Sequence, residues 1–314
     1  MKEIGGYIEF EYYHWKMLHE DGIKLDCGRS CLAYLIEAKR IKKIAMPSFM
    51  CDAVFNLCTR YGVEMDFYKV GYDLKPEQVC FDNEEYLYLA NYYGQLTNEE
   101  IKRYKEMHER IIVDNTQAYF SEPVENVDTL YTCRKYFGVP DGGILYTDKL
   151  LSKDLPRSES FNQMEYLMGR FERSASEFYE KSSINNDRFE DQPTLQMSLL
   201  TENLLHGINY EFVKKRREEN YAYLENRFGM INRLSVKMAE GPFAYPLMIS
   251  ENASAIRKQL AREKIYIPVL WPNVIKEEGT VNYDLAMNIL PLPCDQRYGL
   301  DEMAYMADRI ASML

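Results

Sequence analysis

The sequence predicts an α/β fold in which helices flank a mostly parallel β-sheet, followed by a smaller α+β domain. Short apolar segments alternate with helical patterns through the first half of the chain. This alternation is typical of parallel strands joined by right-handed crossovers. Residues 161–220 then have a largely helical pattern, and separate strand and helix patterns follow to the C-terminus.

The first half is expected to supply most of the large sheet. Its predicted helices are residues 30–40, 51–61 and 98–108, with apolar residues at helical spacing. Its predicted strands are residues 43–46, 65–70, 86–93, 111–113, 129–133 and 143–147. Because ligands of such sheets bind outside the carboxyl ends of the strands, polar residues directly after a strand are the candidate site residues.

The second half is expected to form the smaller domain. A long helix over residues 211–225 would lead into it, and helices are also predicted at 254–263 and 300–313. Strands are predicted at 243–250, 287–292 and, as an edge strand carrying Pro268, at 264–269. We therefore expect an N-terminal segment (1–25), a large cofactor-binding domain (26–210) and a small C-terminal domain (211–314).

Composition excludes several classes of function. The 314 residues carry a net charge of −11, which disfavours nucleic-acid binding and requires a local basic site for any anionic substrate. Seven scattered cysteines without a CxxC pair and only four histidines predict reduced thiols and no metal site. With neither a membrane-length apolar run nor a signal-peptide pattern, we expect a cytoplasmic protein without membrane contact.

Gly28, Arg29 and Ser30 open the first predicted helix. A helix N-terminus offers free N–H groups and a positive dipole end to a phosphate. Ser30 can also act as the N-cap, and Arg29 can pair with an anion. An ordinary capped helix start is the alternative, and on these residues alone it is the favoured one.

Asp114 and Lys135 each follow a short apolar strand. Asp114 can also be explained as a turn made with Asn115. Lys135 stands next to Arg134, whose like charge would lower the pKa of the lysine and favour Schiff-base chemistry, although most lysines are simply on the surface. The glycine pair Gly142-Gly143 then permits close backbone approach or a simple turn.

The order of these features matters more than any one of them. A phosphate-binding helix start, an acid and then a lysine about twenty residues later are what a pyridoxal-phosphate site requires. The acid would keep the pyridine nitrogen protonated, and the lysine would hold the cofactor and then move the substrate proton.

From residue 25 onward the sequence resembles the sugar-aminotransferase branch of the fold-type I enzymes, often called the DegT family. The matching segments, in chain order, are Gly28-Arg29-Ser30-Cys31-Leu32, Met46-Pro47-Ser48-Phe49, Asn91-Tyr92-Tyr93-Gly94, Asp114-Asn115-Thr116-Gln117-Ala118, Arg134-Lys135 with Gly142-Gly143, and Val269-Leu270-Trp271-Pro272. The stretch from Asp114 to Gly143 is the most specific part.

The resemblance implies an aspartate-aminotransferase-like large domain with a seven-stranded sheet, pyridoxal 5'-phosphate as cofactor and a homodimer with shared active sites. Lys135 would form the Schiff base, Asp114 would contact the pyridine nitrogen, and Gln117 would bond near the cofactor's phenolic oxygen. The phosphate would be bound by Gly28, Arg29, Ser30 and Thr132. Phe49, Cys51, Asn91, Tyr93 and Arg297 are candidates for the substrate side.

The chain departs from the family at several positions. Arg29 stands where the family usually has Thr, and Cys51 stands where an aromatic residue often covers the pyridine ring, so that Phe49 or another aromatic residue would have to stack there. For the asparagine that a partner subunit would contribute, the nearest candidates are Asn185 and Asn186. The chain is also shorter than typical members.

Three functions remain open at this point. The first is an aminotransferase that takes an amino donor and a keto acceptor, by the resemblance a nucleotide-linked keto-sugar. The second is another pyridoxal-phosphate enzyme, such as a lyase, racemase or dehydratase. The third is a non-catalytic binding protein on the same scaffold. The basic run 214–217 is expected to be a solvated helix face, and Arg297 binds either a carboxylate or only its neighbours.

Overall fold

The structure is a computed structural model that describes residues 4–77, 84–250 and 253–314. Its main sheet has seven strands in the order β1-β7-β6-β5-β4-β2-β3. They are β1 (Ile23–Leu25), β2 (Lys43–Pro47), β3 (Glu64–Tyr68), β4 (Tyr86–Ala90), β5 (Ile111–Asp114), β6 (Asp128–Thr132) and β7 (Gly143–Tyr146). The pairs β3–β2, β2–β4, β4–β5 and β5–β6 are parallel, whereas β7 is antiparallel to both β6 and β1. The predicted mostly parallel seven-stranded sheet is therefore confirmed.

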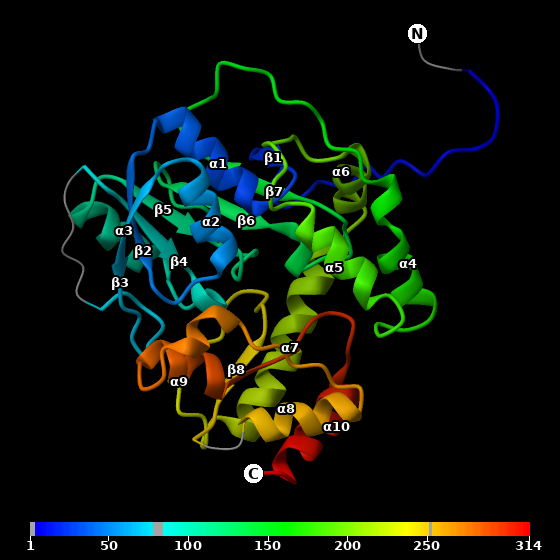
Figure 1. Ribbon diagram of the computed structural model, residues 1–314. Coiled ribbons are helices and arrows are strands. Elements are labelled where there is room, and N and C mark those ends of the chain that lie inside the picture. Colours follow the sequence, from blue (N-terminus) through cyan, green and yellow to red (C-terminus); the bar gives the residue numbers. More distant parts are fainter. Residues whose placement is uncertain (1–3, 78–83, 251–252) are drawn as a thin grey trace.

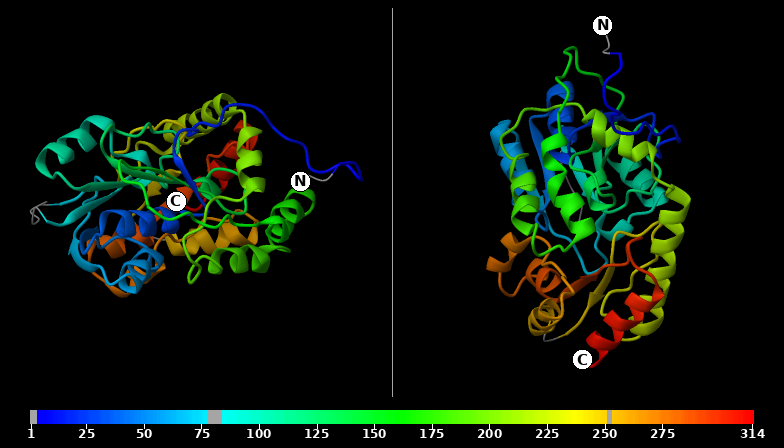
Figure 2. Two further views of the ribbon diagram at one scale, coloured as in Figure 1. Left: turned by 90° about the horizontal axis from the view of Figure 1, so that it is seen from above. Right: turned by 90° about the vertical axis from the view of Figure 1, so that its right-hand side faces the viewer.

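Helices cover both faces of this sheet. Figure 2 places α1 (Gly28–Lys39) and α2 (Asp52–Arg60) on one face and α3 (Asn98–Met107) on the other. The expected strand over residues 86–93 ends at Ala90, because Tyr93 takes a left-handed backbone conformation (φ 51°) inside a short 3-10 turn, η1 (Tyr92–Gly94). The three-residue strand β1 was not predicted, since so short a segment has no measurable periodicity.

The helical region 161–220 contains a 3-10 turn and four helices. They are η3 (Phe161–Gln163), α4 (Glu165–Glu172), α5 (Tyr179–Asp187), α6 (Leu199–His206) and the long α7 (Tyr210–Phe228). Figures 1 and 2 show α7 running along one side of the molecule, from the large sheet to the smaller domain. The basic run at its start is not wholly solvated as expected, because Arg217 is only 1% exposed.

The smaller domain contains an antiparallel pair, β8 (Tyr245–Met248) and β9 (Ile289–Leu292). The helices α8 (Ala253–Arg262), α9 (Val281–Asn288), α10 (Leu300–Ala311) and the 3-10 segment η4 (Pro272–Lys276) complete it. The edge strand predicted at residues 264–269 is wrong. Lys264 is left-handed (φ 63°) and Ile265 N–H bonds back to Leu260 O, while Pro268 has no N–H to give to a neighbouring strand.

Two apolar clusters connect the parts of the molecule. One fills the space between the large sheet and its helices and continues into the smaller domain through Met248, Leu285 and Ile289, and another joins α7, β8, β9, α8 and α10. A domain boundary near residue 210 remains a prediction. Within the described residues, no helix has both the length and the apolar character that crossing a bilayer requires.

His19 fixes the N-terminal segment to the sheet. Its ring lies 4.1 Å from the Tyr131 ring on β6, its Nε2 lies 2.7 Å from the carbonyl oxygen of Tyr119, and its Nδ1 lies 3.3 Å from the Tyr146 hydroxyl. The carbonyl of Tyr119 requires a proton on Nε2, whereas the Tyr146 hydroxyl can pair with Nδ1 either as donor or as acceptor. Burial lowers the pKa of His19 to about 4, although the bond to Tyr119 opposes the shift.

Acidification should therefore destabilise the fold through His19. The unfolded chain takes up this proton below about pH 6.5 and the folded chain only near pH 4, so stability is lost as the pH falls between these values. From pH 7.5 to 5, the free energy of unfolding measured in urea should fall about 2 kcal/mol further in the wild type than in His19→Gln. The exposed-position control His14→Gln should behave as the wild type; an unchanged pH dependence in His19→Gln would contradict this account.

Candidate functional site

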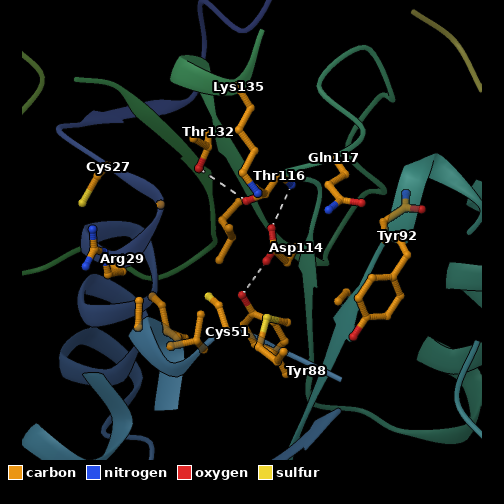
Figure 3. Close-up of a pocket in the computed structure, with 18 of the residues that line it drawn as sticks. Cys27, Arg29, Cys51, Tyr88, Tyr92, Asp114, Thr116, Gln117, Thr132 and Lys135 are labelled. Carbon is orange, nitrogen blue, oxygen red and sulfur yellow. Dashed lines mark hydrogen bonds between the residues drawn. The ribbon is translucent and has the colours of Figure 1, made fainter. Parts of the chain in front are cut away.

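A cavity of about 230 Å³ opens at the carboxyl ends of β4, β5 and β6 (Figure 3). It brings together eight of the residues that the sequence predicted, which are Gly28, Arg29, Cys51, Asn91, Asp114, Gln117, Thr132 and Lys135. Ser30, Phe49, Tyr93 and Arg297 do not line it. The lining also includes residues that the sequence analysis had not assigned to the site, chiefly Tyr88, Thr116, Tyr92, Arg134 and Trp271.

Lys135 ends a 3-10 turn, η2 (Cys133–Lys135), directly after β6. The carbonyl of the next residue, Tyr136, accepts hydrogen bonds from the buried Arg217 of α7 and from Gln296 Nε2 (3.3 and 2.7 Å). Arg217 also lies 4.4 Å from the centre of the Tyr136 ring. The turn that presents Lys135 is therefore held by α7 and by the segment before α10.

The Lys135 side chain is accessible from solvent, but its amine is only partly surrounded by water. Its side chain reaches solvent through the cavity, yet protein surrounds the amine on most sides. Burial lowers the pKa of Lys135, and the positive charge of Arg134 acts in the same direction, while Asp114 and Cys51 oppose the shift. A lowered pKa increases the fraction of Lys135 that is the neutral amine, which is the nucleophilic form.

Asp114 points into the same space as Lys135 (Figure 3). One carboxylate oxygen accepts a hydrogen bond from the Tyr88 hydroxyl and the other from the Thr116 backbone N–H, both at 2.8 Å. Burial and the neighbouring carboxylate raise the pKa of Tyr88, so this hydroxyl remains a donor. Tyr88 and Thr116 therefore fix the direction of the carboxylate that faces the cavity.

The start of α1 approaches β6 very closely. A Cβ atom at Gly28 would lie 2.5 Å from the Thr132 hydroxyl, and that hydroxyl is 3.4 Å from the Thr116 hydroxyl. Only glycine leaves room for the free N–H groups of the helix start beside Thr132. The prediction that Ser30 could act as the N-cap is wrong, because α1 begins at Gly28 and the cap is Cys27, whose sulfur accepts from Ser30 N–H.

The turn after β4 orients the amides of the site. Gln117 Oε1 accepts from the Tyr93 N–H at 2.9 Å, which leaves its NH₂ group directed toward the cavity (Figure 3). Asn91 uses its own amide inside the turn, with the N–H of Leu96 bonded to Oδ1 and Nδ2 donating to Asn115 and to Leu96 O. Gln117 is therefore the amide with a donor group free to meet a ligand.

Trp271 forms an aromatic wall that comes from the smaller domain. Its ring lies 4.4 Å from the buried Phe49 ring and 5.3 Å from the Tyr92 ring. Phe49 is thus covered by Trp271 rather than facing the cavity, whereas Cys51 faces it. Asn273 Nδ2 donates to Met50 O at 2.9 Å and fixes this wall to the large domain.

Arg297 lies elsewhere, where its guanidinium pairs with Asp295 at 2.6 and 2.8 Å. Tyr88 and Thr116 were missed because their role depends on the pairing of β4 with β5, and no local pattern reports that pairing. Trp271 was noticed only as part of the resemblance, since the local sequence around a single aromatic residue beside a proline does not predict which part of a cavity its ring lines.

No protein-family profile and no curated protein sequence matches this chain. Solved structures with the same fold include the sugar aminotransferase CalS13 from Micromonospora echinospora, at 12% identity and TM-score 0.61 over 94% of this chain and 88% of that one. The putative sugar aminotransferase Spr1654 from Streptococcus pneumoniae in its PLP form matches at 11% identity and TM-score 0.64, over 94% and 88%. Helicobacter pylori PseC, an aminotransferase of pseudoaminic acid biosynthesis, matches at 14% identity and TM-score 0.60, over 92% and 85%. At the level of the fold, these likenesses confirm the resemblance seen in the sequence.

The lowered pKa of Lys135 predicts unusual reactivity. In a series of short acetic anhydride pulses at rising pH, followed by peptide mass spectrometry, Lys135 should reach half of its maximal labelling rate at a lower pH than the exposed Lys258. Arg134→Gln removes a repelling charge, so the Lys135 midpoint should rise in that variant. A Lys135 midpoint at or above that of Lys258 would show that the amine is not perturbed.

Proposed function

We propose that this chain is a pyridoxal-phosphate-dependent aminotransferase in which Lys135 carries the cofactor. The observation that carries the proposal is the meeting of Lys135 and Asp114 in one cavity at the carboxyl ends of parallel strands. A fold shared with solved aminotransferases supports it.

The residues present fit the cofactor in two respects. The glycine at position 28 leaves free N–H groups and the Thr132 hydroxyl beside one another, as a phosphate requires. At the end of β5, the Asp114 carboxylate is already oriented by two donors, so that it can hold a protonated pyridine nitrogen. Gly28, Arg29 and Thr132 would then hold the phosphate, with Ser30 supporting the helix start, and Gln117 would donate to the phenolic oxygen.

When bound, pyridoxal phosphate withdraws electrons from the substrate carbon that bears the amino group. Lys135 would hold the cofactor through Nζ, and its amine, when free, would remove and return the substrate proton. Asp114 would keep the ring nitrogen protonated. Trp271 and Tyr92, which line the cavity, would exclude water from one side of the reacting groups.

The acceptor that we propose is a keto-sugar, because the similar structures are named sugar aminotransferases. A nucleotide attached to that sugar is a further part of the proposal, and it comes from the sequence resemblance. A lyase, racemase or dehydratase that uses the same lysine remains the alternative, since one cofactor supports all of these reactions. A non-catalytic binding protein is the other alternative.

Absorption spectra of the protein purified with pyridoxal phosphate test the cofactor and its lysine. The wild type should retain a visible band after dialysis, Lys135→Ala should lose it, and the exposed-lysine variant Lys149→Ala should keep it. An amino donor should bleach the band, and a keto acceptor should restore it. A colourless wild type would favour the non-catalytic alternative, and a stable band that no amino donor bleaches would contradict transamination.

We also propose a homodimer with adjacent active sites. Two packed helices expose large apolar side chains, with Phe171 on α4 93% exposed and Tyr179 on α5 74% exposed, and Tyr7 of the N-terminal segment is 96% exposed. Apolar groups so exposed are typical of protein interfaces. Because α5 ends at residues that contact Arg29 and Arg134 at the cavity, a partner bound there would lie beside the site.

Sedimentation velocity at micromolar concentration tests this assembly. The wild type should sediment as a dimer, and the double variant Phe171→Asp, Tyr179→Asp should shift toward monomer because a buried charge opposes association. Met230→Asp, which changes an equally exposed residue after α7, should remain dimeric. A monomeric wild type would exclude the proposed homodimer.

A further inference from the structure

Three arginines gather around one phenylalanine at the α1 end of the cavity. The guanidinium carbons of Arg188, Arg134 and Arg29 lie 4.3, 4.4 and 5.8 Å from the centre of the Phe189 ring. Arg29 and Arg134 also line the cavity, and Arg188 does not. In a chain of net charge −11, this is a marked local concentration of positive charge.

These charges have few internal partners. Over the described residues, no carboxylate oxygen lies within 4.0 Å of any of the three guanidinium groups. Arg188 interacts electrostatically with the Asp26 carboxyl; burial raises the pKa of that carboxyl to about 6, and Arg188 opposes the shift. Arg29 and Arg134 are thus the two cavity-facing charges without an acid to balance them, and such a pair favours an anion.

Asn186 at the end of α5 and the nearby Phe189 orient the guanidinium groups of Arg29 and Arg134. The Asn186 side-chain oxygen accepts from Arg134 at 2.5 Å, and the Asn186 backbone carbonyl accepts from Arg29 at 3.2 Å. Phe189 supplies the ring that both arginines approach. Asn186 was a candidate to complete the site of a partner subunit, and within its own chain it contacts two arginines that line the cavity.

Two donors of this arginine cluster are left unsatisfied. The Nε–H groups of Arg134 and Arg188 are buried and have no hydrogen-bond acceptor. Arg134 is the one of the two that lines the cavity, and its arrangement costs free energy unless a ligand supplies an acceptor. A phosphate oxygen is a strong acceptor, and the planar guanidinium group can present two parallel donors to it. The free N–H groups of α1 and the Thr132 hydroxyl lie at the same end of the cavity.

We propose that Arg29 and Arg134, oriented by Asn186 and Phe189 of the same chain, form a clamp for a phosphate dianion and complete the cofactor's phosphate site within one subunit. The proposal builds on the function proposed above, because it assigns the dianion to pyridoxal phosphate. It differs from a site whose phosphate is held partly by the neighbouring chain. It also explains why arginine can stand at position 29 in place of a hydroxyl residue.

Binding of two matched ligands tests the clamp. Arg134→Gln should weaken pyridoxal phosphate about 10- to 100-fold more than it weakens pyridoxal, which lacks the phosphate, because the accompanying change in the pKa of Lys135 acts on both ligands alike. Arg134→Lys keeps the charge but loses the paired donors, so its affinity for pyridoxal phosphate should lie between those of the wild type and Arg134→Gln. Arg170→Gln on the exposed face of α4 is the control and should match the wild type. Equal losses for both ligands, or no loss for either, would overturn the clamp.

Inorganic phosphate gives a readout that does not depend on cofactor chemistry. It should raise the melting temperature of the wild type but not that of the double variant Arg29→Gln, Arg134→Gln. If the wild type takes up pyridoxal phosphate but both arginine variants bind it normally, this inference fails and the proposed function stands. If phosphate stabilises the wild type while pyridoxal phosphate does not bind, the proposed function fails, and with it the assignment of the clamp to the cofactor.

Mixed assemblies test whether the clamp acts within one chain. Asn186→Ala and Lys135→Ala chains are denatured together, refolded and titrated with limiting pyridoxal phosphate. If the clamp acts within one chain, the mixed assemblies contain no complete site, because the chain that keeps Lys135 lacks its own Asn186. Recovery of the visible band at about wild-type affinity in a quarter or more of the sites would show that Asn186 acts across subunits, and would overturn the proposal.

Discussion

The close approach of two backbone turns at the edge of the sheet is the constraint on which the site depends. A Cβ atom at Gly143, the first residue of β7, would lie 2.5 Å from the carbonyl of Cys27, and the Gly142 N–H donates to Asp26 O at 2.5 Å. These contacts bring the start of α1 against the end of β6. Lys135, carried by the turn after β6, consequently faces the same cavity as Gly28 and Arg29. The glycine pair thus serves backbone-to-backbone packing first, and the ligand site follows from it.

Charge is distributed unevenly along this cavity. Arg29 and Arg134 stand near the start of α1, where no carboxylate of the described part of the chain pairs with them. Asp114 stands below Lys135 with both oxygens oriented by donors. A ligand with an anionic group at one end and a basic nitrogen at the other would satisfy both. Arg134 has two consequences at once, since its guanidinium meets the anionic end while its charge lowers the pKa of Lys135.

The sequence predicted the sheet well because buried parallel strands and their helices carry strong local patterns. It also placed Asp114 and Lys135 at strand ends, which was sufficient to bring them together. It failed where the outcome depends on partners far along the chain. The segment 264–269 has the composition of a strand but no strand to pair with, and Arg217 has the composition of a surface residue but bonds to the carbonyls of Tyr136 and Pro242. The hydrogen bond from Tyr88 to Asp114 depends likewise on the register of β4 and β5.

Chemical trapping tests most directly whether Lys135 carries pyridoxal phosphate. The protein loaded with the cofactor is treated with borohydride, which fixes an imine to lysine as a stable amine, and is then digested and mapped by mass spectrometry. The account predicts a single stoichiometric pyridoxyl adduct on Lys135, which prior incubation with an amino donor prevents. An adduct spread over exposed lysines, or none on Lys135, would contradict it.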